Sequence, residues 1–227
     1  SKEGKLKNQI TSGPWEVTSY YGYDARRGKV FYQSSEQGSI NRDIYSISDK
    51  GKGQRRLSSG NGTNRAAFST DFSYFINTFS NVDTPPVYTL HKSSDGELVK
   101  ELRHNRELLG RVQGFEMSPK EFSTISVNGN DLNMWMIKPA NFDPSQQYPL
   151  LMFQYSVPGS QQVANSWHGA NDYWHQMLAS EGYIIACVDG RGTGLKGREF
   201  KKMTQLELGK FEVEDQIAAD KELIYRP

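Results

Sequence analysis

The first part of the chain alternates between short apolar runs and turn-forming clusters, a rhythm typical of β-structure. The runs are rich in β-branched and aromatic residues and lie at residues 30–32, 43–47, 74–76 and 87–90. The clusters between them are rich in glycine and polar residues and lie at residues 36–38, 50–53, 60–62 and 93–96. This region is therefore predicted to consist of strands joined by tight turns.

These runs recur at a fixed distance. The pair Phe31-Tyr32 and the pair Tyr74-Phe75 are 43 residues apart, as are the runs that begin at Ile44 and Val87. A period of about 40–45 residues with four short strands per repeat is typical of the blades of a β-propeller. A closed ring needs about four to eight blades, so the pattern predicts part of a propeller, with a small antiparallel sandwich as the alternative.

Near residue 120 the pattern changes. Residues 121–127 and 132–137 alternate like paired strands, with Asn128-Gly129 in the connection. Residues 150–155 and 183–188 are almost continuously apolar, which predicts strands buried on both faces of a sheet.

A helix is predicted after each of the two buried strands. The first covers residues 171–181, with Gly182 as its stop and with apolar residues at helical spacing: Tyr173, Trp174, Met177 and Leu178. The second begins at Lys210. Its predicted apolar face is Val213, Ile217 and Ile224, and the acidic residues suited to its positive N-terminal end are Glu212, Glu214 and Asp215. The order strand, helix, strand, helix predicts a parallel α/β sheet, which this chain leaves incomplete.

Composition narrows the function classes. The 227 residues are 36% hydrophobic and 23% charged, as in a soluble globular protein of one or two domains. The net charge of +1 gives no broad attraction to nucleic acid or anionic membranes.

A lone cysteine, Cys187, excludes an internal disulfide and a cysteine-rich zinc site. No apolar run approaches the ~18 residues of a membrane span. Residues 1–7 lack the apolar region of a signal peptide. The protein is therefore expected to be either cytoplasmic or without its original N-terminal segment.

The motif Gly192-Thr193-Gly194-Leu195-Lys196-Gly197 fits the dinucleotide fingerprint G-x-G-x-x-G and follows a buried strand. The fingerprint should open a helix directly, with an acidic residue at the end of the next strand. Here residues 198–202 are too polar for a packed helix, and the acids at 212–215 lie on a predicted helix. A glycine-rich loop leaving a sheet is therefore favoured over a nucleotide site.

A nucleophilic serine would be expected in G-x-S-x-G, and this pentapeptide is absent from the 227 residues. In hydrolases of this topology the acid and the histidine follow the serine, so none of the four histidines fits the base: His91, His104, His168 and His175. His175 beside Asp172 is interpreted as a pair on a helix surface. No His, Asp or Glu cluster has metal-ligand spacing.

Tyr155 remains as a candidate, because it ends a predicted strand at the edge where open α/β sheets place their sites. Its phenol can donate a hydrogen bond into a cleft; alternatively it anchors a turn.

Four stretches carry a resemblance that extends over essentially the whole chain: residues 85–91 (PPVYTLH), 148–151 (YPLL), 188–194 (VDGRGTG) and 208–216 (LGKFEVEDQ). With them, the sequence resembles the dipeptidyl peptidase IV family of serine peptidases, of the prolyl oligopeptidase class and bacterial type. The resemblance implies a mixed β and α/β fold. Residues 1–110 would form the last blades of a β-propeller, and residues 111–227 the N-terminal part of an α/β-hydrolase domain that ends before the catalytic serine.

The resemblance also implies an activity. The family releases N-terminal dipeptides with a penultimate proline or alanine, using a Ser-Asp-His triad and no metal or organic cofactor. Tyr155 matches the family tyrosine whose hydroxyl completes the oxyanion hole, and the loop around Asp189 and Arg191 would order the exit of a strand. The family usually has glycine before Pro158, where this chain has Val157. Valine does not readily adopt the positive φ angles open to glycine, so the loop either needs none or has another geometry.

The partners implied are peptide substrates, with no nucleic acid and no membrane span in this segment. Members often dimerise, so a homodimer is an expectation. The location implied for the whole protein is periplasmic or extracellular, and the chain alone is expected to be inactive. A catalytically dead relative that serves as an interaction module is the alternative, and the sequence that follows would separate the two.

Overall fold

The structure is a computed structural model that describes residues 4–6, 8–167 and 169–224. The strands of the first half are β1 (Val17–Asp24), β2 (Lys29–Ser34), β3 (Asp43–Ser48), β4 (Arg55–Arg56), β5 (Thr63–Phe68), β6 (Tyr74–Asn81), β7 (Thr84–Lys92) and β8 (Leu98–Arg103). The remaining elements are α1 (Arg106–Gln113), β9 (Lys120–Val127), β10 (Asn130–Ile137), β11 (Leu150–Phe153), α2 (Ala170–Ser180), β12 (Ile184–Asp189), α3 (Arg198–Lys201) and α4 (Lys210–Ile224).

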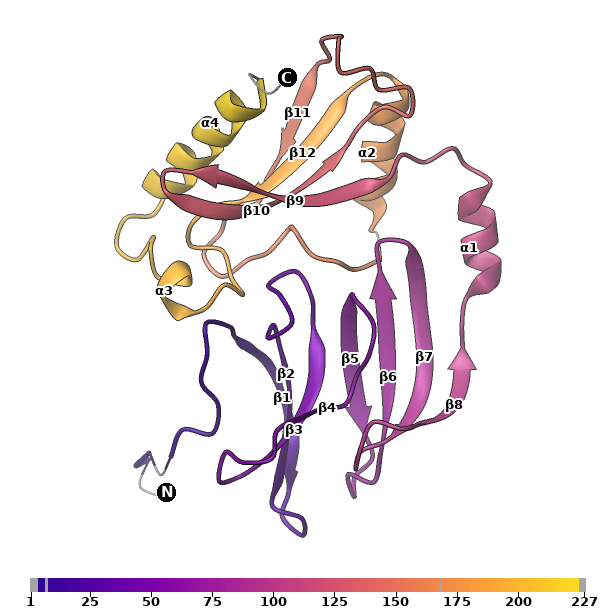
Figure 1. Cartoon of the computed structure of the whole chain (residues 1–227), viewed down its shortest axis with the longest axis vertical. Helices are drawn as coiled ribbons and strands as arrows, with labels where there is room; N and C mark the ends of the chain where they lie inside the picture. Colours follow the sequence, from indigo (N-terminus) through magenta and orange to yellow (C-terminus); the bar gives the residue numbers. More distant parts are fainter. Residues whose placement is uncertain (1–3, 7, 168, 225–227) are drawn as a thin grey trace.

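The first half forms two antiparallel four-stranded sheets, ordered β1-β2-β3-β4 and β5-β6-β7-β8. Figure 1 shows them side by side below the rest of the chain. The 43-residue spacing relates β2 to β6 and β3 to β7, so equivalent strands occupy equivalent places in the two sheets. Consecutive strands pair with their neighbours, as in propeller blades. The predicted blade structure is therefore confirmed.

Aromatic packing joins the two blades. Phe31 of β2, Ile44 of β3 and Phe75 of β6 are buried in one cluster. The ring of Phe72, in the β5–β6 turn, stacks on Phe31 with centroids 5.3 Å apart. Burial of such side chains removes a large apolar area from water, so this contact helps to hold the two blades together.

A third sheet lies above the blades in Figure 1, in the order β11-β12-β10-β9. Strands β11 and β12 are parallel, as predicted, with Leu150 opposite Ile184. Strands β9 and β10 form the predicted hairpin, and β10 runs antiparallel to β12. The hairpin turns at Asn128 and Gly129, both with positive φ, which suits the right-handed twist of the strands. The sheet is therefore mixed rather than wholly parallel.

Helices cover both faces of the third sheet (Figure 1). Ala219 of α4 packs in one buried cluster with Leu132, Met134 and Val188. Ala179 of α2 packs in the cluster on the other face, which includes Trp135, Ile137, Ile185 and Cys187. Successive side chains of a strand point to opposite faces of the sheet, so consecutive residues along β10, and along β12, pack into the clusters on the two opposite faces. The layers are helix, sheet, helix.

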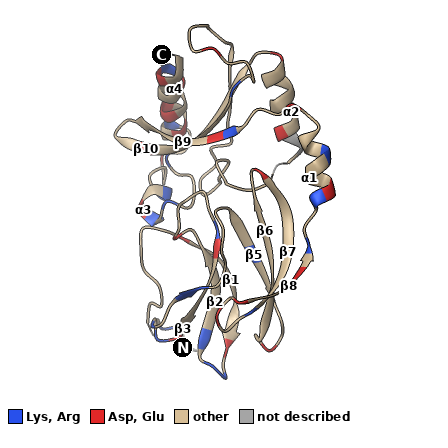
Figure 2. Ribbon diagram, turned by 45° about the vertical axis from the view of Figure 1, so that its right-hand side comes forward, with Lys and Arg blue, Asp and Glu red and all other residues tan. Residues whose placement is uncertain are grey.

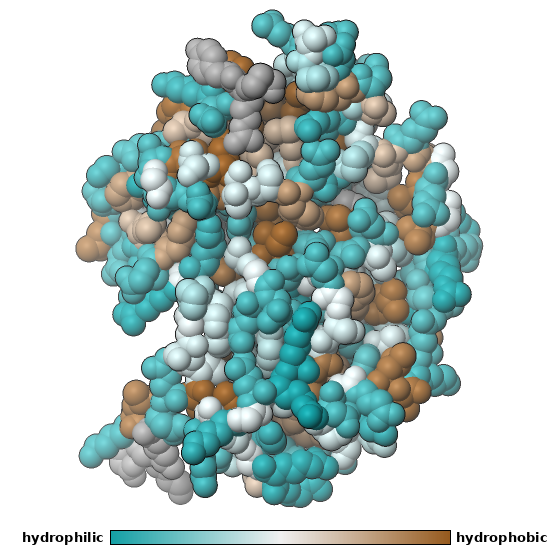
Figure 3. Space-filling model, in the orientation of Figure 1, coloured by the Kyte–Doolittle hydropathy of each residue, from teal (hydrophilic) through white to brown (hydrophobic). Residues whose placement is uncertain are grey.

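Both predicted helices are present, but most of their apolar residues do not pack on the sheet. On α2, Leu178 packs against the core, whereas Tyr173, Trp174 and Met177 are exposed. On α4, the predicted apolar face is exposed, with Val213 at 55% and Ile217 at 51%. The helices turn alanines toward the sheet, because small residues let a helix axis approach closely. Some exposed apolar residues appear as brown patches among teal in Figure 3.

Strand β11 corrects a further prediction. It ends at Phe153 and lies at the edge of the described sheet, so its residues are only partly buried, not enclosed on both faces. Tyr155 therefore lies two residues past the strand.

Charged residues of both signs are interspersed over the two halves (Figure 2), in keeping with the small net charge. The predicted boundary between residues 110 and 111 falls within α1, which connects β8 to the segment before β9. Division into domains 1–110 and 111–227 stays a prediction.

Candidate functional site

Tyr155 lies just beyond the carboxyl end of β11, with 58% of its surface exposed. Its hydroxyl forms no hydrogen bond with any residue that the structure describes, whereas its backbone carbonyl accepts one from Ser160 Oγ at 2.8 Å. The backbone is thus held while the phenol stays available. The arrangement provides a hydrogen-bond donor at the strand end.

The loop after Tyr155 rests on the loop that leaves β12. Gly159 N donates to Gly192 O at 2.8 Å, and Gly194 N donates to Ser160 O at 2.9 Å. These two bonds tie the exits of the parallel strands β11 and β12 together. The position of Tyr155 consequently depends on the β12 exit.

Val157 does not adopt a positive φ, but Gly159 does, at 77°. The residue with the left-handed backbone conformation is therefore Gly159, two positions after Val157. Valine in place of the family glycine is accommodated without backbone strain at that position.

Each glycine of the G-x-G-x-x-G motif is packed against protein. A Cβ on Gly192 would lie 2.4 Å from Thr204 Oγ1, and one on Gly194 would lie 2.8 Å from the Gly159 carbonyl oxygen. A Cβ on Gly197 would lie 3.3 Å from Pro14. The glycines thus have a packing role, as expected for a loop leaving a sheet. The short helix α3 that follows buries Phe200, so the prediction that residues 198–202 are too polar for a packed helix was wrong.

Asp189 and Arg191 order the exit of β12, as predicted. The Asp189 carboxylate accepts hydrogen bonds from the amides of Gln162, at 2.9 Å, and Val163, at 2.9 Å. Burial raises the pKa of Asp189 above its ordinary value, and these amide bonds oppose that shift. Arg191 pairs with Asp215 of α4.

Asn165 links the segment between β11 and α2 to both blades. Its amide N donates to Ile40 O at 2.9 Å, and its side chain donates to Asn41 Oδ1 at 3.2 Å. Its side-chain oxygen accepts from Val82 N at 3.2 Å, and its carbonyl accepts from Thr63 Oγ1 at 2.9 Å. The Tyr155 loop is therefore continuous with a segment fixed on the propeller-like half.

A second contact between the halves lies at Glu16. Its carboxylate accepts from Leu195 N at 2.6 Å and pairs with Lys201 Nζ at 2.6 Å. The two loops that flank the candidate site are thus both tied to the blades.

Two anchors of the site carried no distinctive sequence signal. Gln216 of α4 donates to Val188 O at 2.9 Å and to Ser156 Oγ at 3.3 Å, and Ser160 holds Tyr155. A polar residue on a helix and a serine in a loop are too common to single out, so only the fold shows their roles.

None of the three described histidines forms a hydrogen bond or a ring contact with Tyr155. His175 is buried, with rings of Phe153 and Trp135 at 4.9 and 5.4 Å, so its prediction as a surface pair with Asp172 was wrong. The helix turns this ring inward because aromatic neighbours surround it, although Asp172 Oδ1 still lies 3.8 Å from its Nδ1. His91 stacks on Phe75, His104 is exposed, and His168 lies outside the described residues.

Within residues 4–6, 8–167 and 169–224, no group of three or more His, Cys, Asp or Glu side chains could hold a metal. No helix among the same residues is long and apolar enough to cross a membrane.

Two family models match this chain. Residues 1–86 match the dipeptidyl peptidase IV (DPP IV) N-terminal region, and residues 169–227 match the prolyl oligopeptidase family. The probable dipeptidyl-aminopeptidase B of Pyrenophora teres f. teres is 35% identical over 93% of the chain, and the probable dipeptidyl peptidase 4 of Emericella nidulans is 30% identical over 94%.

Solved structures agree with these matches. The crystal structure of Porphyromonas gingivalis dipeptidyl peptidase 4 superposes with a TM-score of 0.91 at 45% identity, covering 97% of this chain. A putative dipeptidyl aminopeptidase IV from Bacteroides ovatus gives 0.82 at 27% identity over 95%. The chain spans 24% and 28% of the two fungal relatives, and 31% and 30% of the two solved chains.

Proposed function

This chain belongs to the dipeptidyl peptidase IV group of the prolyl oligopeptidase family, and from that membership we propose that it forms part of a serine exopeptidase. The whole enzyme releases N-terminal dipeptides from peptides with a penultimate proline or alanine. Residues 1–110 contribute blades of the propeller, and residues 111–227 contribute the first part of the α/β-hydrolase domain. Peptides are the proposed substrates.

The observation that carries the proposal is the exposed Tyr155 beyond the carboxyl end of β11, whose hydroxyl forms no hydrogen bond with any described residue. Peptide hydrolysis by a serine nucleophile passes through a tetrahedral intermediate whose oxygen gains negative charge. A donor aimed at that oxygen stabilises the transition state more than the ground state, which raises kcat. Tyr155 is proposed as that donor.

The surrounding hydrogen bonds suit this role. Because Ser160, Gly159 and Gly194 hold the loop backbone, the phenol starts from a fixed point and moves only through its own side-chain torsions. A preorganised donor costs little reorganisation when the charge appears.

The test is Tyr155→Phe in the complete protein that contains this chain, assayed with a Gly-Pro chromogenic substrate. Loss of one oxyanion donor should lower kcat by about 10²- to 10³-fold, or ~3–4 kcal/mol, with little change in KM. The matched control is Tyr183→Phe, which removes a hydroxyl next to the opposite end of β12 and should leave both constants unchanged.

The outcomes distinguish the alternative roles of Tyr155. A tyrosine that only anchors a turn predicts a lower melting temperature and near-normal kcat. An unchanged kcat in a folded Tyr155→Phe variant removes Tyr155 from the mechanism. A wild-type complete protein that is folded but inert toward all such substrates points instead to an interaction module.

The proposal extends to assembly and location by resemblance alone. We place the complete protein in the periplasm or outside the cell, as a homodimer. Sedimentation of the purified complete protein, and fractionation of its host cells, test these two statements separately.

A further inference from the structure

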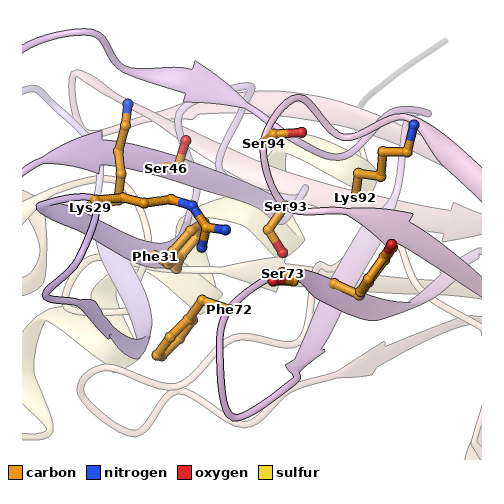
Figure 4. A pocket seen from close by; sticks show the side chains of 10 residues that line it. Lys29, Phe31, Ser46, Phe72, Ser73, Lys92, Ser93 and Ser94 are labelled. Carbon is orange, nitrogen blue, oxygen red and sulfur yellow. The ribbon is translucent and has the colours of Figure 1, made fainter.

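A cavity of about 350 Å³ lies between the two blades, at the end turned away from the third sheet. Figure 4 shows side chains from both blades around it. Its lining includes three cationic residues, Arg27, Lys29 and Lys92, and no aspartate or glutamate. A pocket lined by one sign of charge concentrates ions of the opposite sign.

Lys29 supplies the uncompensated charge. Arg27 Nη1 lies 2.6 Å from Asp24 Oδ2, and Lys92 Nζ lies 2.7 Å from Glu97 Oε2. Lys29 forms no ion pair with any residue that the structure describes. Arg27 has further N–H groups beyond the one that Asp24 accepts, so it can still donate into the cavity.

Ser93 gives an independent indication of a ligand. The residue is only 4% exposed, yet its hydroxyl has no hydrogen-bond partner among the residues that the structure describes. Figure 4 places it in the middle of the pocket, with its hydroxyl directed toward Ser73. Ser73 Oγ itself donates to Asp71 Oδ2 at 2.6 Å. A buried unpaired hydroxyl is unfavourable, and a bound acceptor would satisfy it.

The rest of the lining sets the size and character of the ligand. Phe72 forms the apolar side of the cavity, with the nearly fully buried Phe31 stacked on it, and Ser46 and Ser94 add polar groups. The volume falls within the range of small-molecule sites and exceeds what a bare anion needs.

We propose that this cavity between the blades binds a phosphate-type oxyanion carried on a small organic body, as in a sugar phosphate. The oxyanion lies against Lys29, Arg27 and Ser93, and the organic body contacts Phe72. The site is independent of the peptidase function, and its ligand bridges the two blades.

Isothermal titration calorimetry on the complete protein that contains this chain, at low and constant ionic strength, tests this, because salt screens such contacts. Glucose 6-phosphate, inorganic phosphate and glucose are the probes. Glucose 6-phosphate should bind saturably and glucose should not. Tighter binding of glucose 6-phosphate than of phosphate supports an organic ester as the ligand, whereas equal binding would contradict the organic part of the proposal and identify the free ion.

Two variants locate the site. Lys29→Gln should weaken binding by about tenfold or more, since a charged hydrogen bond is lost. Ser93→Ala should weaken it by a smaller factor. The matched control is Lys52→Gln, in the exposed β3–β4 connection, which should bind like the wild type. Circular dichroism establishes that each variant is folded.

Absence of saturable binding by either phosphate probe would overturn the proposal. Binding that folded Lys29→Gln and Ser93→Ala proteins retain in full would also overturn it.

Discussion

Arg191 and Asp215 form a bidentate ion pair that joins the exit of β12 to helix α4. Arg191 Nη2 lies 2.7 Å from Asp215 Oδ1, and Arg191 Nε lies 3.0 Å from Asp215 Oδ2. The backbone amide of Arg191 adds a third bond to the same carboxylate at 2.7 Å. Because Asp215 is fully buried, its charge is compensated almost entirely by this one partner.

Asp215→Asn should destabilise the chain by up to about 3–5 kcal/mol, because it leaves a largely buried guanidinium with only the half-exposed Glu214, at 3.2 Å, as counter-ion. Urea unfolding followed by circular dichroism measures the change. Glu107→Gln, which breaks the exposed Glu107–Arg111 pair of α1, is the control and should leave the free energy of unfolding nearly unchanged. Equal stabilities for the two variants would contradict the assignment.

The free energy of unfolding should fall as the pH rises and Asp189 loses its proton. Burial raises its folded pKa above the ordinary value, so the native state binds the proton more tightly than the unfolded state. This contribution is complete below the unfolded pKa of about 3.9 and is lost as pH rises through the raised folded pKa. The difference in unfolding free energy between wild type and Asp189→Asn, measured at several pH values, isolates it. If the stability of the wild type relative to Asp189→Asn rose with pH instead, the folded pKa of Asp189 would be lowered and not raised.

Cys187 should be unreactive in the folded chain. Its side chain is fully buried, and burial raises the pKa of its thiol, so the reactive thiolate is scarce at neutral pH. An aromatic disulfide reagent should label no thiol under native conditions and one thiol per chain in urea. Rapid labelling of the native chain would contradict the packing of β12.

The 227-residue chain alone should not hydrolyse a Gly-Pro or Ala-Pro chromogenic dipeptide, because no G-x-S-x-G pentapeptide is present to supply the nucleophile. The assay is release of the chromophore over hours, with the complete protein as positive control. Turnover that copurifies with the chain and is blocked by a serine-directed inhibitor would refute this.

The strands were predictable because their signal is local. Phe31 and Phe75 recur at a constant spacing, and the period of two along a strand leaves little choice of which residues face the core. The hairpin around Asn128 and Gly129 was predictable for a similar reason, since those residues suit a turn with positive φ.

The helix faces were not predictable, because hydrophobicity does not say which neighbours a helix meets. Ala219 and His175 are buried by close approach and ring packing, whereas Val213 and Trp174 are exposed. The position of Tyr155 near a strand end was predictable, but the anchoring of its loop by residues of β12 and α4 depends on contacts between distant parts of the sequence.

The hydrogen bonds of residues 161–167 and of Glu16 have a consequence for the order of folding. Asn165 and Asn41 are 124 residues apart in the chain, and Glu16 and Leu195 are 179 apart. Contacts between such distant residues close large loops and form slowly. The blades and the third sheet can each form from nearer pairings, and the hydrogen bonds of the Tyr155 loop itself lie within the second half. We therefore expect the segment 161–167, and not the Tyr155 loop, to take its final position only when the blades and the third sheet have docked.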